Sequence, residues 1–278
     1  MRRSFAQVLK EGNISIRREY DKLFALLHEP LFSNSDISLF DVISKNITRL
    51  PFRGTCLSLE EFDEKYGFNF VKKPEHVDVD YLIAFCEYMY NLVTGLNNAT
   101  IFSWDGVERS INYSNYLSQI NAVIEELGYV QAMDGFIYIF VEKSPAAIAV
   151  SESDTIPDEL SFRVLEYNHQ KLRGDLEQKK QIILQIASII EAKEKSLLKI
   201  APGLKDNLSF ALNNLNLRHN NVDKEGKNYR KQIDEMDRNE LEKLYDYTYQ
   251  MCLLAIMELD YKDNKEVIES LKRNISNN

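Results

Sequence analysis

The sequence LKDNLSFALNNLNLRHNN, from Leu204 to Asn221, joins an amphipathic helix to the most distinctive polar cluster of the chain. Its apolar residues recur at spacings of three and four, as on one face of an α-helix. They are Leu204, Leu208, Ala211 and Leu215. Arg218 comes next on that face, so we expect its guanidinium to point where the leucines point. Because an unpaired buried arginine costs several kcal/mol, we expect it to meet a carboxylate, an asparagine network, a phosphate or a second copy of the chain.

His219 follows Arg218 directly and lies one full helical period beyond Leu212, just before an asparagine-rich loop. This pair is the best site candidate in the sequence. A structural role accounts for the same residues, because basic side chains in a last helical turn oppose the helix dipole. Asparagines likewise cap helix ends and build turns. The sequence leaves both interpretations open.

Length and composition predict a folded, mainly α protein. A chain of 278 residues is long enough for two domains with hydrophobic cores. Hydrophobic residues make up 44% and charged residues 28%, which argues against a disordered chain. Cys56, Cys86 and Cys252 are widely spaced, and no histidine or cysteine cluster has the spacing of metal ligands. We therefore expect free thiols, no zinc and no other cofactor.

The charge of the chain restricts its partners. A formal net charge of −9 repels nucleic acid at long range, so contact with RNA requires a local basic pocket. Residues 1–3 (Met-Arg-Arg) are not followed by the apolar run of a secretory signal. No stretch of about twenty apolar residues occurs that would span a bilayer. We expect a cytoplasmic protein with no membrane segment.

Turn-forming residues at 151–157 predict a boundary between a domain of residues 1–150 and a second domain of residues 151–278. The first domain is predicted to be α+β. Its helices are expected at residues 14–27, 57–62, 79–96 and 110–127. Gly128 is a natural C′ glycine for the last of these. Asp134-Gly135 between two β-prone runs predicts a hairpin of residues 129–132 and 136–141.

A helix followed at once by a hairpin has the outline of a winged helix. Such a unit reads DNA only if its helix offers positive charge to the phosphates. The helix of residues 110–127 contains no lysine or arginine and ends with Glu125 and Glu126. We therefore expect this winged-helix-like unit to have a structural role or to bind a protein partner.

The second domain is predicted to be an antiparallel four-helix bundle with a short tail helix. The helices are expected at residues 159–170, 174–200, 204–217 and 238–259, with the tail at 265–275. The long helix of residues 174–200 carries one apolar stripe for the core and starts a second with Ile182 and Ile189. This second stripe predicts a homodimer through the bundle. Lys179 and Lys180 alternate with acidic residues and are expected on a salt-bridged solvent face.

Residues 159–261 resemble the HEPN superfamily, the helical ribonuclease-like domains of bacterial abortive-infection and toxin–antitoxin systems. Members place an arginine, a polar residue and, a few positions later, a histidine between one helix and the last long one. Arg218-His219 matches the start of this motif and its place in the bundle. The terminal histidine is missing, because Asp223, Lys224 and Glu225 stand where it is expected.

The resemblance implies metal-independent cleavage of RNA by a dimer. Arg218 would then clamp the phosphate and His219 would act as acid or base. The residues that would position the substrate are Asn214, Asn220, Asn221 and His169. His169, four residues before Arg173, is also a conceivable second titratable group. The missing histidine leaves open whether such a domain is active or degenerate.

Two hypotheses follow from the sequence. The first is an abortive-infection-like defence protein with a HEPN-type, active or degenerate ribonuclease domain, whose first half senses a trigger or binds a partner. The second is a non-enzymatic, dimeric interaction or adaptor protein that binds a protein partner. Replacement of Arg218 separates them, because it should abolish RNA cleavage under the first hypothesis and mainly alter stability or oligomeric state under the second.

Overall fold

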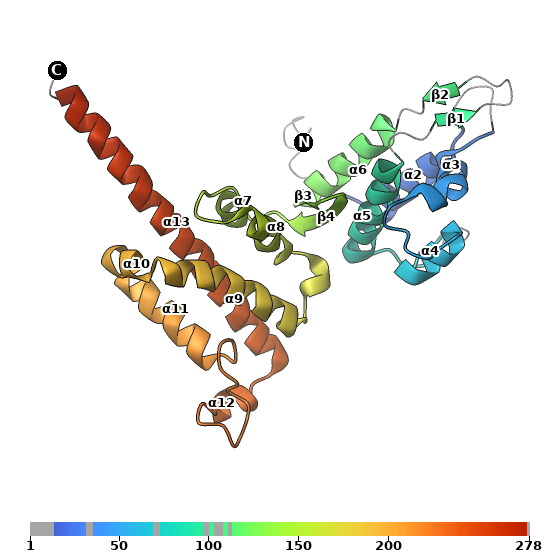
Figure 1. The fold of residues 1–278 in the computed structure, drawn as a ribbon. Coiled ribbons are helices and arrows are strands. Elements are labelled where there is room, and N and C mark those ends of the chain that lie inside the picture. Colours follow the sequence, from blue (N-terminus) through green and yellow to red (C-terminus); the bar gives the residue numbers. More distant parts are fainter. Residues whose placement is uncertain are drawn as a thin grey trace, which may run out of the picture. The chain divides into compact units, whose positions relative to one another are not determined.

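The computed structural model describes residues 14–31, 36–68, 73–96, 100–102, 108–110 and 113–276 (Figure 1). These residues are mainly helical, as predicted, and also form two two-stranded sheets. The predicted absence of a secretory signal concerns residues outside the described part. The chain divides into two compact units, residues 1–140 (unit 1) and 141–278 (unit 2).

The division at Phe140 and Val141 lies ten residues before the expected boundary. Helix α7 (Pro145–Ser151) belongs to unit 2 because it buries Ala147 and Val150 in the core of that unit. The turn-forming residues 151–157 therefore connect α7 to α8 (Asp158–Glu166) within one unit. Turn chemistry marks the end of a helix, but only the burial of the neighbouring side chains shows to which core that helix belongs.

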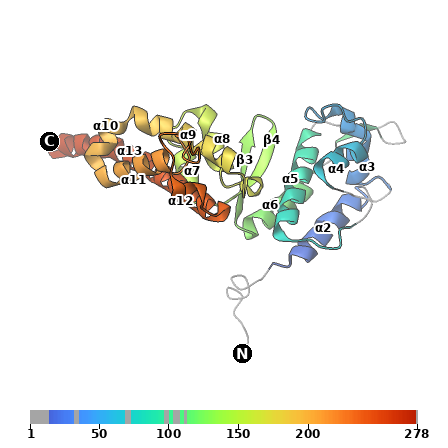
Figure 2. The same ribbon diagram turned by 90° about the horizontal axis from the view of Figure 1, so that it is seen from below.

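Unit 1 is built around α5 (Val79–Gly95), which is buried along most of its length. Figure 2 shows α2 and α6 beside it, and both pack against it. The remaining elements of the unit are α2 (Ile16–His28), α3 (Leu39–Asn46), η1 (Ile47–Arg49), α4 (Leu59–Tyr66), α6 (Ser114–Glu126), β1 (Thr100–Phe102), β2 (Glu108–Ser110) and β3 (Tyr129–Asp134). β4 (Ile137–Glu142) begins in unit 1 and ends in unit 2. Residues 111 and 112 of the predicted helix 110–127 lie outside the described part.

The predicted hairpin is present as β3 and β4, and Gly128 and Gly135 adopt the positive φ that their positions require, 79° and 59°. Side chains of α5 bond to the outer edge of β4. Asn91 exchanges two hydrogen bonds of 2.8 Å with the backbone of Tyr138, and Glu87 accepts the Phe140 N–H at 2.9 Å. These two α5 residues, one turn apart, take the place of a third strand and close the sheet edge.

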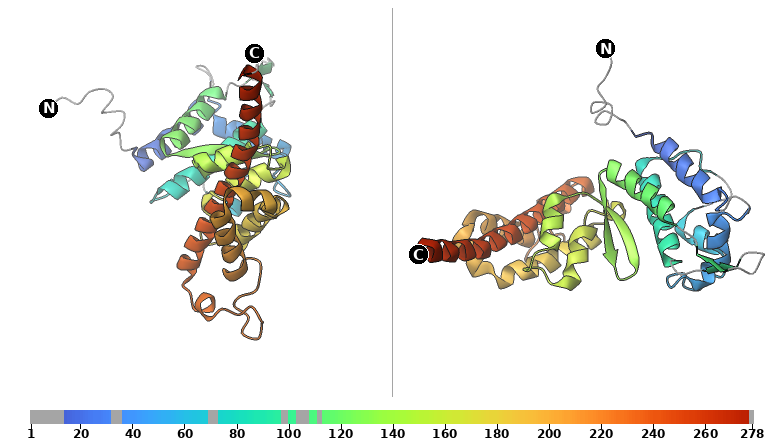
Figure 3. Two further views of the ribbon diagram at one scale, coloured as in Figure 1. Left: turned by 90° about the vertical axis from the view of Figure 1, so that its left-hand side faces the viewer. Right: turned by 90° about the horizontal axis from the view of Figure 1, so that it is seen from above.

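Unit 2 is organised around α13 (Arg238–Ser276), which runs along the whole unit (Figure 3). Helices α7, α9, α10 and α11 pack against it. The other elements are η2 (Gln170–Leu172), α9 (Leu176–Ala192), α10 (Glu194–Ile200), α11 (Pro202–Asn214) and α12 (Lys231–Asp234). The predicted core stripe of α13 is buried, including Tyr245, Cys252 and Ile256. The helices of unit 2 therefore pack in a bundle-like arrangement, as predicted.

Two predicted helix boundaries differ from the structure. The expected helix 174–200 is interrupted at Lys193, where α9 ends and α10 begins, and α10 turns to pack on α11 and α13. The expected helix 238–259 and tail helix 265–275 form one continuous helix instead. The connecting residues 260–264 contain no glycine or proline, so nothing in the backbone ends the helix there.

The second apolar stripe of α9 is used within unit 2. Ile182 is fully buried, and Ile189 packs against the same core. This stripe therefore packs within unit 2, and the expected homodimer stays a prediction. Among the described residues, none of the helices has the length and apolar character needed to cross a bilayer.

Candidate functional site

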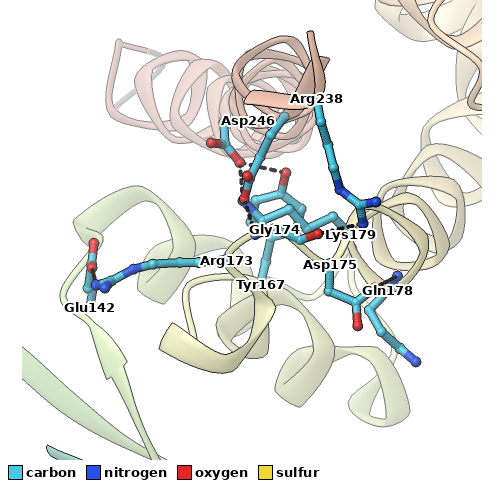
Figure 4. A network of polar contacts seen from close by, with 10 residues as sticks. Glu142, Tyr167, Arg173, Gly174, Asp175, Gln178, Lys179, Arg238 and Asp246 are labelled. Atoms are coloured by element: carbon cyan, nitrogen blue, oxygen red, sulfur yellow. Dashed lines mark hydrogen bonds and ion pairs between the residues drawn. The ribbon is translucent and has the colours of Figure 1, made fainter. Parts of the chain in front are cut away.

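A pocket of about 770 Å³ opens in unit 2 where the end of α8, η2, the start of α9 and the first turns of α13 meet. Its floor is a network of polar contacts, seen from close by in Figure 4. The lining contains three cationic side chains, three carboxylates and a histidine. They are Arg173, Lys179, Lys243, Glu142, Glu242, Asp246 and His169.

Lys179 is the centre of this network. Its side chain is buried, and its ammonium nitrogen lies 2.7 Å from Glu242 Oε1 and 2.7 Å from Asp246 Oδ1. The prediction of a solvent-facing Lys179 is wrong. Lys179 follows Leu176 by three residues and precedes Ile183 by four, so it falls on the apolar stripe of α9 and points toward α13. Its carboxylate partners neutralise the buried charge.

Two tyrosines extend the network. Tyr167 donates a hydrogen bond of 2.9 Å to Asp246 Oδ1, and the Lys179 ammonium lies 5.2 Å from the centre of its ring. Tyr249 stacks on Tyr167 with ring centroids 3.8 Å apart and donates to the Val164 carbonyl at 2.7 Å. The aromatic pair forms a rigid wall beneath the charged groups.

Glu242 remains charged because of its surroundings. Burial alone would raise the pKa of its carboxyl group, but the Gly174 N–H, which donates to Oε1 at 2.7 Å, and the Lys179 ammonium outweigh burial and lower the pKa. Burial and the nearby Asp246 raise the pKa of Tyr167, and burial raises the pKa of Tyr249. These three groups therefore keep their charge states through the neutral pH range.

The rim of the pocket is polar and exposed. Arg173 forms an ion pair with Glu142, as Figure 4 shows. Arg238 donates to the Gly174 carbonyl at 2.8 Å and so ties α13 to the start of α9. Asn239, Lys243 and Gln250 complete the rim on the α13 side. The pocket thus has a floor of paired charges beside a stacked tyrosine pair, and a rim of mixed charge.

His169, a predicted site residue, lines this pocket and is buried. It is not in a helix but precedes η2, and its backbone forms a bridge with Val141. Its Nδ1 accepts the Lys171 N–H at 3.3 Å. This hydrogen bond occupies the Nδ1 lone pair of the ring.

Arg218, the principal predicted site residue, lies elsewhere. α11 ends at Asn214, and Asn216 takes a left-handed conformation with φ of 57°, so the helical face does not continue to Arg218 as expected. Its guanidinium nevertheless forms an ion pair with Glu191 and donates to Asn213 Oδ1 at 3.0 Å. A carboxylate and an asparagine were two of the four partners expected for it. Half-buried His219 follows it in the loop.

Asn221 holds this loop together. It is completely buried, and its Oδ1 accepts the Asn216 N–H at 2.7 Å. Its Nδ2 donates to the carbonyls of Asn213 at 3.2 Å and Asn228 at 2.8 Å. A side chain that satisfies three backbone groups from different parts of a loop has a structural role.

The other two predicted asparagines also have local partners. Asn214 donates to the Phe210 carbonyl at 2.9 Å and accepts from Arg230 Nε at 3.0 Å. Asn220 accepts the Val222 N–H at 3.3 Å. These contacts close turns of the loop between α11 and α12.

The structure thus separates the predicted site residues. His169 lines the pocket described above, whereas Arg218 lines a smaller one of about 270 Å³ between α9, α10 and α11. Sequence reasoning missed the group of Tyr167, Lys179, Glu242 and Asp246. Two signals pointed to it: a lysine on an apolar stripe, and two carboxylates one turn apart at the start of a core helix.

The three cysteines are free and buried. In the part of the chain that the structure describes, no group of three histidine, cysteine or acidic residues could hold a metal ion. Comparison of the chain with protein-family models, curated proteins and solved structures gave no match.

Proposed function

We propose that the chain is a non-enzymatic interaction protein of the cytoplasm, and that the pocket of unit 2 binds a segment of a protein partner. The observation that carries this proposal is the pairing of charge inside the pocket. Lys179 lies between Glu242 and Asp246, and Arg173 pairs with Glu142. These five side chains are thereby committed to holding the pocket in shape.

The same contacts argue against Lys179, Glu242 and the Nδ1 of His169 as catalytic groups. A general base needs a lone pair that a substrate proton can reach. The Nδ1 of His169 accepts a backbone N–H, and Glu242 is bonded to both Lys179 and Gly174. The Lys179 ammonium is held by two carboxylates and is not available as a nucleophile.

The composition of the pocket favours a peptide over a polyanion. Its three cations and three carboxylates balance, so a nucleic-acid backbone would gain little attraction there. Buried Tyr167, Tyr249 and Leu253 add apolar surface beside the paired charges, and an exposed polar rim surrounds them. Apolar surface with a polar rim is the usual anatomy of a protein interface. A pocket of this size accommodates the side chains of a short segment.

Selection of binding peptides from a random displayed library tests the proposal. We expect peptides that bind the full chain in solution and lose at least tenfold in affinity on Ala146→Trp, because Ala146 lines the pocket and an indole there fills it. Ala149→Trp is the matched control, because Ala149 is exposed on the same helix and does not line the pocket. Melting curves check that both variants fold.

Either of two results would overturn the proposal. One is a selection that enriches no peptide over an unrelated immobilised protein. The other is a set of peptides that bind the Ala146→Trp variant as tightly as they bind the wild type, because such peptides occupy another surface.

We propose as a second candidate the function that the HEPN resemblance implies, a metal-independent ribonuclease of abortive-infection type, active or degenerate. The observation in its favour is the accessibility of the Arg218 ion pair. The side chain of Arg218 is 34% exposed and that of Glu191 50%, so a phosphate can replace the carboxylate beside His219. In this candidate, unit 1 with its winged-helix-like α6 and hairpin binds a partner or senses a trigger.

Incubation of total bacterial RNA with the purified protein in EDTA tests the second candidate. Cleavage that is lost in folded Arg218→Ala and His219→Ala variants would support it. Lys227→Ala, at an exposed position of the same loop, is the control and should retain cleavage. Intact RNA with the wild-type protein would exclude activity on these RNAs and leave Arg218 with a structural role.

A further inference from the structure

Large apolar side chains are exposed along α13 at intervals of seven residues. They are Tyr247, Leu254, Tyr261, Ile268 and Ile275, with exposed fractions of 59%, 44%, 63%, 50% and 66%. In the heptad notation abcdefg they occupy position a. Position d, three residues later, is occupied by Gln250, Met257, Asn264 and Leu271. We refer to the a and d residues of the projecting part, Tyr261, Asn264, Ile268, Leu271 and Ile275, as the α13 seam.

The second half of α13 projects from unit 2. Figure 1 shows this end of the helix extending beyond α9, α10 and α11. Most side chains after Leu259 are exposed. Even so, residues 261–276 include large apolar residues at Val267 and Leu271 as well as at the a positions. An isolated helix of this length is only marginally stable in water. The exposed apolar stripe on it therefore indicates a surface that binds a partner.

An apolar repeat of seven residues is the pattern of a coiled coil, in which a and d residues of one helix fill the gaps between those of another. The projecting part of the helix fits this pattern. Ile268, Leu271 and Ile275 follow at spacings of three and four, and Val267 at position g widens the stripe. The partner of the seam is therefore expected to be another heptad helix.

We propose that the α13 seam pairs with the seam of a second copy of this chain in a parallel, two-stranded coiled coil. The flanking charges select this arrangement. Lys265 and Lys272 both occupy position e. An antiparallel pair places e residues against each other and would bring these lysines together, whereas a parallel pair places e opposite g.

The g residues suit a parallel partner. Asp260 at g lies opposite Lys265 of the second copy, which gives an attractive pair on each side of the seam. The Asp260 hydrogen bonds with Ser153 and Thr155 use only Oδ1. Val267 at g lies opposite Lys272, whose hydrocarbon stem can cover it.

Asn264 supports the choice of a second copy. It is the polar residue in the middle of the projecting seam. In a parallel, in-register pair the two Asn264 amides face each other and bond to each other, whereas any shift buries each against an apolar residue. A polar residue at one core position fixes register in this way at a cost in stability.

Light scattering during size-exclusion chromatography of the full chain tests the proposal. We expect a mass twice the 32.4 kDa of one chain, and a single-chain mass for the double variant Ile268→Glu with Leu271→Glu. Phe210→Glu is the matched control, since Phe210 is 66% exposed and belongs to α11 rather than to the seam, and this variant should stay dimeric. A wild type at the single-chain mass throughout the micromolar range, or a double variant that stays dimeric, would overturn the proposal.

A cysteine at a core position tests the parallel arrangement. Leu271→Cys places two thiols face to face in a parallel pair, so mild oxidation should yield a disulfide-linked dimer. The native cysteines are buried and should not react, which the oxidised wild type verifies. A dimer that forms no such crosslink would contradict the parallel seam.

Discussion

The ammonium nitrogen of Lys179 lies 2.7 Å from Glu242, and this contact joins α9 to the first turns of α13 at the floor of the unit 2 pocket. The two residues are far apart in sequence, and each belongs to a helix that supplies much of the core of the unit. Their contact therefore connects the shape of the pocket to the packing of the whole unit.

Lys179→Met should destabilise the protein strongly. Removal of the cation leaves Glu242, whose side chain is only 16% exposed, without its partner. Loss of one partner of a buried ion pair costs about 3–5 kcal/mol, and we expect the lower end because Asp246, the second carboxylate, is 39% exposed. Urea unfolding measures the change. Lys180→Met is the control, because the neighbouring residue is only partly buried, and its effect should stay below about 0.5 kcal/mol. Equal effects of the two substitutions would mean that the ion pair is not what the unit depends on.

Asp63 in unit 1 should make stability fall as pH rises from about 4 to 7. Burial raises the pKa of its carboxyl group, and the hydrogen bond from Tyr88 opposes only part of this rise. The resulting pKa is about 7. In this range the folded state holds a proton that the unfolded state, with an ordinary pKa of about 4, has lost. Stability from this group is therefore complete at low pH and is lost as the pH approaches 7.

Asp63→Asn isolates this contribution, because the neutral amide does not titrate. As the pH rises from 4 to 7, the free energy of unfolding of the wild type should fall relative to that of the variant. Above pH 7 the difference between the two should stay constant. Urea titrations at several pH values measure this difference. A difference that does not change with pH would show that Asp63 is charged in the folded state.

The structure also shows which parts of the fold a sequence can predict. Gly128 and Gly135 marked a helix end and a turn correctly, because only glycine takes a positive φ there without strain. The break between α9 and α10 at Lys193 has no such marker and follows from the packing of α10 on α11 and α13. Local chemistry therefore located the turns, and tertiary packing decided where the longest helices break or continue.

The candidate site shows the same division. The sequence predicted that Arg218 would need a carboxylate or an asparagine, but it could not identify Glu191, which lies on another helix. It missed the site of Lys179 because a lysine among acidic residues is usually a solvent-facing one. Position on the apolar stripe outweighs such charge patterning when carboxylates from another helix face the lysine. Those partners lie more than 60 residues away in the chain.

Asn221→Ala should distinguish a structural loop from a substrate-binding one. The substitution removes the side chain that satisfies Asn216, Asn213 and Asn228, and each buried polar group left unsatisfied costs about 1–3 kcal/mol. We expect a lower melting temperature and faster proteolysis between α11 and α12. Asn220→Ala, at an exposed position of the same loop, should change neither. An Asn221→Ala variant with unchanged stability would contradict the structural role and leave substrate positioning as the role of Asn221.

Asn264→Leu should tighten the dimer while loosening its register. A leucine at this d position replaces a buried amide pair by apolar contact, so we expect the dissociation constant to fall roughly tenfold, and species larger than a dimer to appear. Analytical ultracentrifugation measures both effects. Ser270→Leu adds the same side chain at position c, away from the seam, and should leave the dissociation constant unchanged. Weaker association of the Asn264→Leu variant would show that Asn264 lies at the edge of the contact rather than in its core.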